Sequence, residues 1–493
     1  MKWKEKGCLL MNKTTQRYFI NLFKRKKRIL ALYTFVVFMA YPFLLLTDLI
    51  TNGGNRFVNL TEVMFALCLV VLGALAFILP LFTFKFVFSK KNVDTYYAIP
   101  INRNHLFKAH FIAPILGTII PILASYLVGG LFIIPSSGLS GYFELLVVLL
   151  MSFLMFITIY SMNTFIIMKC NNILDASIIS GAIGIVPFML YGAMYTFLRS
   201  QIVRSGMIDS FVDAIPQMII DLFSPYRGLA LMGEIVRTRS IYQIFVSFKD
   251  LDYVLFFYYI VIGILFMIYA KKSFKFKKGE DAEQLTTHYL TYPLLTNLAL
   301  ITLILNFNIT EYDITTAVII MIVLFVLYVI INAIANRSFK IKTSMILKFL
   351  ILFIGVNAFN IISKETEFFG INRKVIDYTN YEEIEINYSF YDYGNETSEV
   401  IVVDVDPENI SEDEIKLFDY FKEIQKEKSL AFKEDDQDRL YPNNGKGDYN
   451  LNITYNYYKD ATKSDRKNQY VHYQLSDEQA RCIQKIMKEI KGK

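Results

Sequence analysis

The chain has 493 residues, of which 54% are hydrophobic and only 19% are charged. An average soluble domain carries about 25% charged residues, so the composition argues against intrinsic disorder, a collagen-like structure and a wholly soluble enzyme. The net charge of +6 is unevenly divided: residues 1–362 hold 32 Lys and Arg against 17 Asp and Glu, whereas residues 363–493 hold 19 against 28. This division indicates a membrane part with basic edges and an acidic, aqueous tail.

Long apolar runs predict the membrane part. A helix crosses the hydrocarbon core with about 20 apolar residues at roughly 1.5 Å rise each. Runs of this kind occur at 29–50, 63–86, 109–134, 142–168, 173–198, 253–270, 290–307, 315–335 and 345–362. The first run is too long for a cleavable signal, and no small-residue cleavage site follows it. The fold class predicted is a polytopic α-helical membrane protein with about nine spans and a small C-terminal α+β soluble domain.

Lys and Arg between the runs predict the orientation. Basic residues gather before the first span at 24–28 and after the second, fourth, sixth and eighth spans, whereas the intervening short loops are nearly bare. Because cytoplasmic loops carry the excess of Lys and Arg, the N-terminus is expected inside the cell. With nine spans, the C-terminal domain is then expected outside, which gives a multi-pass protein of the cell membrane.

Residues 207–222 are apolar enough to suggest a further span, but they contain Asp209, Asp213 and Asp221. A carboxylate near the bilayer centre costs roughly 2.5–3.5 kcal/mol on insertion scales, and Pro216 interrupts the segment. An interfacial or re-entrant helix fits this pattern better than a crossing. The stretch 199–252 is therefore expected to be one long outer loop with short helices.

Side chains suited to catalysis or ion coupling are scarce in the predicted spans. Asp175 is expected at the inner start of the fifth span, and the other acidic residues lie near span ends. A secondary carrier usually places carboxylates or His near the midplane, so the pattern disfavours that class. The four cysteines show no CxxC spacing, which argues against a structural zinc site.

The inner loop after the second span, residues 89–108, contains the most informative segment. Val93, Tyr96, Tyr97 and Ile99 form a short apolar and aromatic face at near-helical spacing, and Asp94 lies near the helix N-terminus, where a carboxylate is favoured. Pro100 ends this turn. Asn102 can cap the next helix, which carries Arg103, Leu106 and Phe107 into the third span.

Two interpretations of this face remain open. It can be an ordinary amphipathic loop whose aromatic rings lie at the level of the lipid head groups. It can also be a short helix held above the membrane, whose apolar face fits a groove on a partner protein.

The stretch VDTYYAIPINRNHLF resembles the first inner loop of ABC exporter permeases of the type-2 membrane-domain class, and more closely a Gram-positive subgroup in which the loop reads D-x-x-x-x-x-P-hydrophobic-x-R. In that family the loop contains the coupling helix that docks on the ATPase. The resemblance therefore implies an ATPase-coupling interface in this loop. Its expected residues, taken from the aromatic face and from the family motif, are Val93, Asp94, Tyr96, Tyr97, Ile99, Pro100, Ile101, Arg103, Leu106 and Phe107.

The resemblance extends over about residues 10–275. Residues 1–28 resemble a cytoplasmic amphipathic elbow, and 29–270 a six-span permease domain with the coupling loop 89–108 and the outer helical loop 199–252. Residues 271–362 add three spans, and 363–493 add the extracytoplasmic domain, as in the same subgroup.

The chain contains no G-x-x-x-x-G-K-[ST] motif, so it encodes no Walker-type phosphate loop. ATP is therefore expected on a separate ATPase chain, with no catalytic residue, cofactor or metal in this one. The expected partners are ABC ATPase subunits, a second identical or paralogous permease and membrane lipid, but not nucleic acid. The function implied is the permease subunit of an exporter or of a peptide-antibiotic resistance module.

The tail predicts two strand–strand–helix units. Residues 381–393 and 399–405 alternate apolar and polar side chains as strands do, and Ser411 with Glu414 forms a capping-box pattern before a helix that runs to about 428. Residues 451–457 and 469–475 predict a second hairpin, and Ser476 is expected to cap the last helix.

Two other functions remain open. One is a membrane enzyme acting on lipid-linked substrates, and the other is a membrane-anchored sensor whose outer domain binds a ligand. The enzyme would need clustered acidic or His residues at an interface, and nine spans exceed what an anchor requires.

Overall fold

A computed structural model describes residues 13–52, 57–201, 217–238, 250–284, 286, 288, 291–307, 313–366, 368–369, 383–392, 395–404, 411–433, 448–458 and 466–491. The chain forms two compact units. The first consists of Met1–Phe188, Ile219–Leu298 and Ile331–Ser338, and the second of Met189–Met218, Ala299–Ile330 and Phe339–Lys493.

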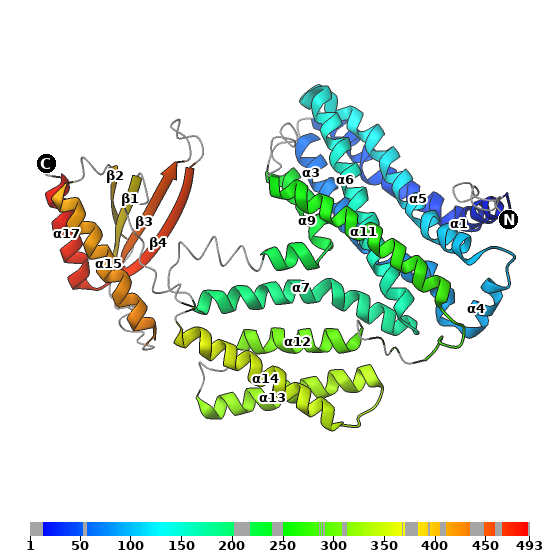
Figure 1. The fold of residues 1–493 in the computed structure, drawn as a ribbon. Helices are drawn as coiled ribbons and strands as arrows, with labels where there is room; N and C mark the ends of the chain where they lie inside the picture. Colours follow the sequence, from blue (N-terminus) through cyan, green and yellow to red (C-terminus); the bar gives the residue numbers. More distant parts are fainter. Residues whose placement is uncertain are drawn as a thin grey trace, which may run out of the picture. The chain divides into compact units, whose positions relative to one another are not determined.

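The first unit is a helix bundle (Figure 1). Its helices are α1 (Lys13–Ala40), α2 (Pro42–Asn52), α3 (Phe57–Thr83), α4 (Lys90–Tyr97), α5 (Arg103–Gly130), α6 (Ile134–Lys169), the first half of α7 (Ile173–Gln201), α9 (Tyr226–Thr238) and α11 (Asp250–Phe276). A short 3₁₀ turn, η1 (Lys85–Phe88), joins α3 to α4. The bundle also includes the start of α12 (Tyr292–Phe307) and the end of α13 (Ile314–Asn336).

Eight helical stretches of the described residues are long and apolar enough to cross a membrane, which fits a multi-pass helical membrane protein. They overlap eight of the nine predicted spans. The predicted span 290–307 is a 16-residue helix, α12, which is shorter than the others. At about 1.5 Å per residue, α12 is about 24 Å long, against a hydrocarbon core of about 30 Å.

The elbow predicted within residues 1–28 and the first span are not separate helices in the part that the structure describes. Residues 13–40 form one continuous helix, so the basic segment 24–28 and the start of the first span share a single axis. No Gly or Pro interrupts this stretch, and the first break is the turn at Tyr41, directly before Pro42. Residues 1–12 lie outside the described residues.

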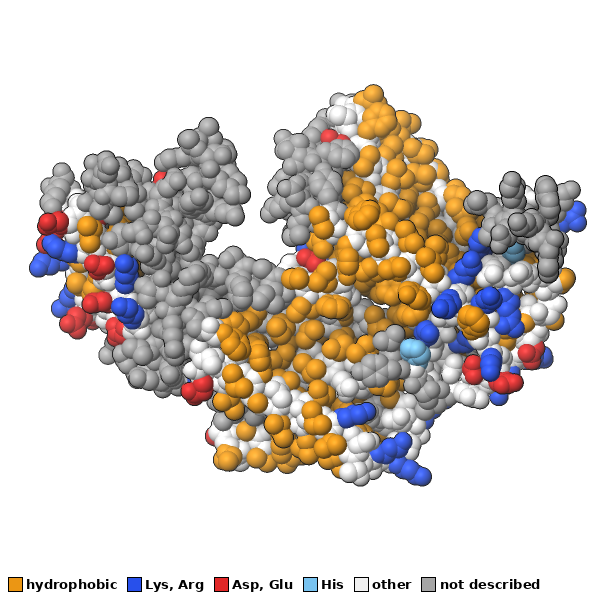
Figure 2. Space-filling view, viewed as in Figure 1, with side chains coloured by type: hydrophobic (Ala, Val, Ile, Leu, Met, Phe, Trp, Pro, Cys, Tyr) orange, Lys and Arg blue, Asp and Glu red, His pale blue; other side chains and the backbone are white. Residues whose placement is uncertain are grey.

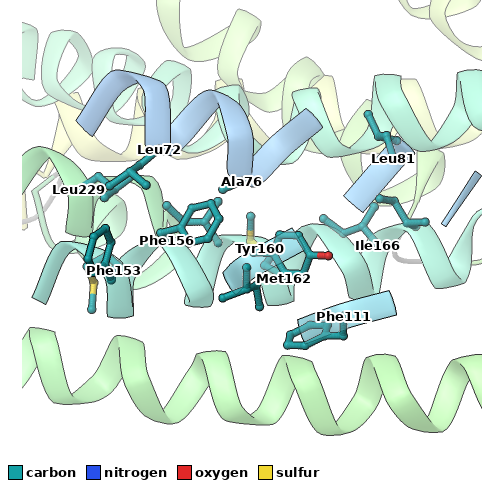
Figure 3. Packing of buried hydrophobic residues seen from close by; sticks show 14 of the residues in the cluster. Leu72, Ala76, Leu81, Phe111, Phe153, Phe156, Tyr160, Met162, Ile166 and Leu229 are labelled. Carbon is teal, nitrogen blue, oxygen red and sulfur yellow. The ribbon is translucent and has the colours of Figure 1, made fainter. Parts of the chain in front are cut away.

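Helix α6 forms the centre of the first unit. Phe153, Phe156 and Tyr160 on α6 are almost fully buried and lie against side chains of α3, α5 and α9, as Figure 3 shows. The outer surfaces of the helices are apolar instead: Val70 is 71% exposed and Phe257 is 69% exposed. Figure 2 shows this apolar covering along the helices, with Lys and Arg gathered at the end near α4. An apolar core with an apolar outer surface is what lipid as a solvent demands.

The predicted outer loop 199–252 packs in part against the bundle. Residues 217–223 are helical, and α9 follows the turn at Ser224 and Pro225. Met232 on α9 is fully buried, and Leu229 packs in the same core cluster as α3 and α6. This part of the chain thus consists of two short helices rather than one long apolar helix, whereas Asp209 and Asp213 lie outside the described residues.

In the second unit, α12, α13 and α14 (Thr343–Glu365) share a small apolar cluster formed by Leu300, Ile304, Leu324 and Phe349, among others. Each of these four side chains is almost fully buried. A second cluster joins Phe197 and Leu198 of α7 to Leu305 of α12. These clusters pack the three added helices together within this unit.

The C-terminal residues of the second unit form a small α+β fold (Figure 1). Its strands are β1 (Glu383–Asp392), β2 (Asn395–Asp404), β3 (Asp448–Tyr458) and β4 (Arg466–Leu475), and its helices are α15 (Glu412–Lys433) and α17 (Asp477–Lys491). The sheet is antiparallel with the order β2-β1-β3-β4. The predicted strand–strand–helix order therefore occurs twice, and the first strands of the two repeats pair at the centre.

Alternation along the strands places the domain core on one face of the sheet. Ile384, Ile386 and Tyr388 are buried, and they form one apolar cluster with Phe418 and Phe421 of α15. Both helices begin as predicted. Ser411 and Glu414 satisfy each other's backbone N–H groups, and Ser476 does the same with Gln479.

The close approach of α5 to the turn between α1 and α2 gives a test of the bundle core. A Cβ atom at Gly129 would lie 2.5 Å from the Tyr41 ring, which is 3% exposed and stacks on Tyr126 at 4.3 Å. We expect Gly129→Ala to destabilise the protein by about 1–3 kcal/mol, because the buried ring cannot move freely. Thermal unfolding in detergent, followed by loss of the monodisperse chromatographic peak, measures the effect.

The matched control is Gly181→Ala, where the added carbon would meet no neighbouring heavy atom within 4 Å. It should leave stability unchanged or raise it by up to about 1 kcal/mol, as expected for Ala in a helix. Equal thermal stability of the two variants would contradict the packing described at Tyr41.

Candidate functional site

The loop 89–108 has the local structure that its sequence predicts. α4 spans Lys90–Tyr97, and the N–H of Ala98 still donates to the carbonyl of Asp94. Helix α5 then begins at Arg103, where the side chain of Asn102 accepts a hydrogen bond from the N–H of Asn104 at 3.0 Å. The helix break before Pro100 and the cap at Asn102 are thus confirmed.

The aromatic face of α4 packs against the chain's own helices. Val93 is fully buried, and the Tyr96 ring stacks on Phe86 of η1 at 4.1 Å between centroids. The Tyr97 ring meets Phe274 of α11 edge-on at 6.0 Å. The hypothesis of an apolar face presented to a partner therefore does not fit these rings, because η1 and α11 already cover the apolar side of the short helix.

A polar side of α4 is exposed instead. Lys90, Lys91, Asn92, Asp94 and Thr95 are exposed in the structure. Between α4 and the segment after α11 lies an open groove of about 690 Å³, lined in part by Lys90, Asp94, Arg103, Lys278 and Glu280. Any molecule that approaches this end of the bundle meets charged groups of both signs first.

Arg103 joins α4 to α11. Its guanidinium carbon lies 4.0 Å from the centroid of the Tyr97 ring, within the range of a cation–π interaction. Its Nη1 atom donates to the carbonyl of Lys275 at 3.0 Å. Arg103 is the first residue of α5, so the loop, α5 and the end of α11 are linked through one side chain.

Lys277, directly after α11, is a buried cation with 6% exposure. Its Nζ atom donates to the carbonyl of Met168 at 3.2 Å and to the carbonyl of Cys170. The last carbonyls of a helix have no partner within the helix, and a cation there also interacts favourably with the helix dipole. Lys277 therefore closes the C-terminal end of α6.

Lys277 also contacts the loop 89–108 and η1. Its carbonyl accepts a hydrogen bond from the Tyr97 hydroxyl at 3.5 Å, and its Nζ atom lies 5.8 Å from the centroid of the Phe88 ring of η1. Burial lowers the pKa of Lys277 to about 8, an effect that the neighbouring Cys170 and Asp281 oppose. Burial also raises the pKa of Tyr97, against the effect of Arg103.

A buried carboxylate holds the same end of the bundle together. Asp175, at the start of α7, is 4% exposed and accepts hydrogen bonds at 2.9 Å from both Thr286 and Tyr292. Arg337, just after α13, lies 3.5 Å from it. The sequence predicted Asp175 at the inner start of a span, but held no signal for these three partners.

The ten predicted interface residues divide into three groups. Val93, Leu106 and Phe107 are buried; Tyr96, Tyr97, Ile99 and Ile101 are partly buried; Asp94, Pro100 and Arg103 are exposed. The structure brings all of them to one end of the bundle. The predicted site is thus a fixed structural element with an exposed polar surface.

A second polar set, which the sequence did not predict, lies inside the bundle. The Nδ2 atom of Asn163 on α6 donates to the carbonyl of Ala76 at 3.0 Å and to the Tyr226 hydroxyl at 3.1 Å. Arg227 and Asp221 form an ion pair at 3.2 Å near the same turn. The hydroxyl of Tyr259 on α11 donates to the Asp221 carbonyl at 2.7 Å. Because the sequence assigned Asp221 to an outer loop, its place among the helices is a finding of the structure.

The residues that the structure describes hold no group of three or more His, Cys, Asp or Glu side chains placed to bind a metal ion. The chain matches no family model, no curated protein and no solved structure with which it was compared.

Lys277 gives a prediction with a defined sign. Because the pKa of Lys277 falls from 10.5 to about 8 on folding, the unfolded chain binds more protons between these pH values. The penalty for burying the charge is complete below pH 8 and is relieved as the pH rises, so the native protein should gain stability in this window. Replacing Lys277 with Met should remove a gain on the order of 2 kcal/mol between about pH 8 and pH 10.

Thermal unfolding in detergent at a series of pH values measures this difference. The control is Lys278→Met, since the neighbouring Lys278 is exposed, and this variant should follow the native pH profile. If Lys277→Met and Lys278→Met have the same profile, Lys277 does not carry a buried charge.

Proposed function

We propose that this chain is the permease subunit of an ABC transporter of the type-2 exporter class, driven by a separate ATPase chain. The observation that carries the proposal is the position of α4. This short helix contacts η1, α5 and α11 through its aromatic side, and its polar side is exposed. An exposed helix that is rigidly joined to several long helices can transmit a displacement to them.

The proposed coupling passes through three contacts. Arg103 joins α4 directly to α5 and to the Lys275 carbonyl, and Tyr97 joins it to Phe274 of α11. ATP on the partner shifts the equilibrium of the permease only if the partner contacts the two states of α4 unequally. The rigid attachment of α4 makes such a difference available to the bundle.

The chemistry of docking follows from the exposed groups. Lys90, Lys91 and Asp94 would meet the partner, rather than the tyrosine rings. An interface of exposed charges depends on complementary charges on the partner and weakens as salt screens them. The proposed ATPase therefore carries an acidic and basic pattern complementary to α4.

The proposal keeps nine spans. Tyr292, the first residue of α12, and Arg337, directly after α13, both contact Asp175 at the basic end of the bundle. α12 therefore starts at this end of the bundle and α13 ends there. If α13 crosses the membrane, the shorter α12 must cross it as well. With the basic end inside the cell, α14 leads outward and the C-terminal domain is extracytoplasmic.

In this proposal two permeases, identical or paralogous, form the path for a cargo, and the complex works as an exporter or a peptide-antibiotic resistance module. The bundle would supply one half of the path, with ATP bound only on the partner chain.

Charge reversal at Asp94 tests the coupling. We expect Asp94→Arg to reduce the ATP hydrolysis that co-purifies with the full-length protein from its native membrane by about tenfold, or ~1.4 kcal/mol of binding. Asp94 is exposed, so the membrane part should still assemble and elute as a single species. The assay is ATP turnover per mole of purified chain.

The control is Asp419→Arg, the same change at an exposed residue of α15 whose side chain is 64% exposed. It should leave ATP hydrolysis unchanged. Failure to recover any nucleotide-hydrolysing chain with the native protein, or equal hydrolysis in both variants, would refute the proposal.

Cysteine labelling tests the topology. In a background without the native cysteines, Lys416→Cys in α15, where the native side chain is 65% exposed, should react with a membrane-impermeant maleimide in intact cells. Asn92→Cys in α4 should react only after permeabilisation, because α4 lies at the basic end, which is expected inside. Labelling of position 416 only after permeabilisation would show that α12 does not cross.

A further inference from the structure

A second, separate pocket of about 620 Å³ opens between the ends of α6 and α11. Its polar lining includes Lys169, Lys272, Lys277 and His288. We call it the α6–α11 pocket. It shares only Lys277 with the groove beside α4.

The pocket is basic. Lys169, Lys272 and Lys277 contribute three positive charges, and Asp281 contributes one negative charge. The Lys277 ammonium is held by the carbonyls at the end of α6, so its charge is fixed in place. Burial and the nearby Lys169 lower the pKa of His288. The lining thus carries an excess of positive charge that a bound anion would offset.

One wall of the pocket is apolar and faces outward. Tyr269 and Phe276 on α11 line the pocket and are 52% and 65% exposed, and Phe165 of α6 lies under the Lys169 ammonium at 5.7 Å. Ile268 and Leu265, further along α11, are also exposed. A basic pocket therefore opens directly onto the apolar outer surface of a helix.

We propose that the α6–α11 pocket binds an anionic phospholipid, with its phosphate against Lys169 and Lys272 and an acyl chain along the exposed apolar side of α11. Basic pockets between the ends of membrane helices suit phosphate head groups, and Lys is a phosphate ligand as a point charge. A soluble phosphate would use the same lysines but would leave the exposed side chains of α11 uncovered. This inference requires only that the helices lie in a membrane, and does not rest on the proposed ATPase.

The lipid would also stabilise the loop 89–108. It would bind beside Lys277, which also lines the groove next to α4, at the point where the ends of α6 and α11 meet. A lipid that binds when the ends of α6 and α11 are together, but not when they are apart, would stabilise the conformation seen here.

Quenching by brominated lipids measures binding at this position. The only native tryptophan is Trp3, so a Trp3→Phe background carrying Phe276→Trp reports on the pocket. The full-length protein is reconstituted in mixtures of phosphatidylcholine and brominated phosphatidylglycerol, and then in mixtures of brominated phosphatidylcholine and phosphatidylglycerol. Ile334→Trp, where the native side chain of α13 is 59% exposed, reports on ordinary lipid contact.

We expect phosphatidylglycerol to bind at Phe276→Trp about fivefold more tightly for each lysine that faces the phosphate, and to show little preference at Ile334→Trp. Lys272→Gln alone should reduce the preference at Phe276→Trp about fivefold, and Lys272→Gln together with Lys169→Gln should reduce it to that of the control position. Lys271→Gln removes one charge, as Lys272→Gln does, from the neighbouring residue of α11, which does not line the pocket, and should preserve the preference.

Three results would overturn the proposal. One is an equal preference at Phe276→Trp and Ile334→Trp. Another is an equal loss in Lys271→Gln and Lys272→Gln, which would indicate general surface charge. The third is displacement of the brominated phosphatidylglycerol by millimolar inorganic phosphate, which would assign the pocket to a soluble anion. None of these readings depends on ATP hydrolysis, so the inference and the proposed function can fail separately.

Discussion

The structure of the basic end of the bundle depends on the hydrogen bonds that the Lys277 ammonium donates at the end of α6. The last turn of α6 leaves carbonyl groups that no helix residue can satisfy, and Lys277 donates to that of Met168 and to that of Cys170, which directly follows the helix. Because Lys277 lies directly after α11, this contact fixes the end of one long helix against the end of another. The Tyr97 hydroxyl then binds the carbonyl of the same residue, which holds α4 in place.

The attachment of α4 explains how so short a helix keeps its structure. Eight residues are too few for a stable isolated helix in water, so most of the stability of α4 must come from packing. Val93 is fully buried, Tyr96 stacks on Phe86, and Tyr97 packs between Phe274 and Arg103. The tyrosines therefore have a structural role, and the charged residues available for recognition are Lys90, Lys91 and Asp94 on the exposed side of the helix.

Local features of the sequence predicted local structure well. The break before Pro100, the cap at Asn102 and the capping box of Ser411 with Glu414 depend on residues a few positions apart, and all occur in the structure. The apolar runs located eight long helices and the shorter α12 for the same reason. In each case the residues that determine the structure are close together in the sequence.

Features that depend on distant residues were not predictable in this way. The carbonyls that Tyr97 and Arg103 bind lie more than 170 residues away, so the spacing of side chains on α4 could not show which side is covered. The single axis of α1 was missed because an amphipathic segment and an apolar span look like two elements, although nothing between them ends a helix. Asp221 was assigned to an outer loop because Tyr259, whose hydroxyl binds its carbonyl, lies 38 residues further along the chain.

Helix α11 connects the two polar regions of the bundle. In its first half, Tyr259 binds the carbonyl of Asp221 in the short helix 217–223, and at its end Lys275 and Phe274 hold α4. The stretch from Tyr259 to Phe276 spans about 25 Å of continuous helix, and α11 packs along α6 within the same core. Because α11 is one continuous helix, the contacts that hold α4 and the hydrogen bond between Tyr259 and Asp221 belong to the same element. The exposed helix α4 and the polar groups around Asp221 are thus attached to one helix.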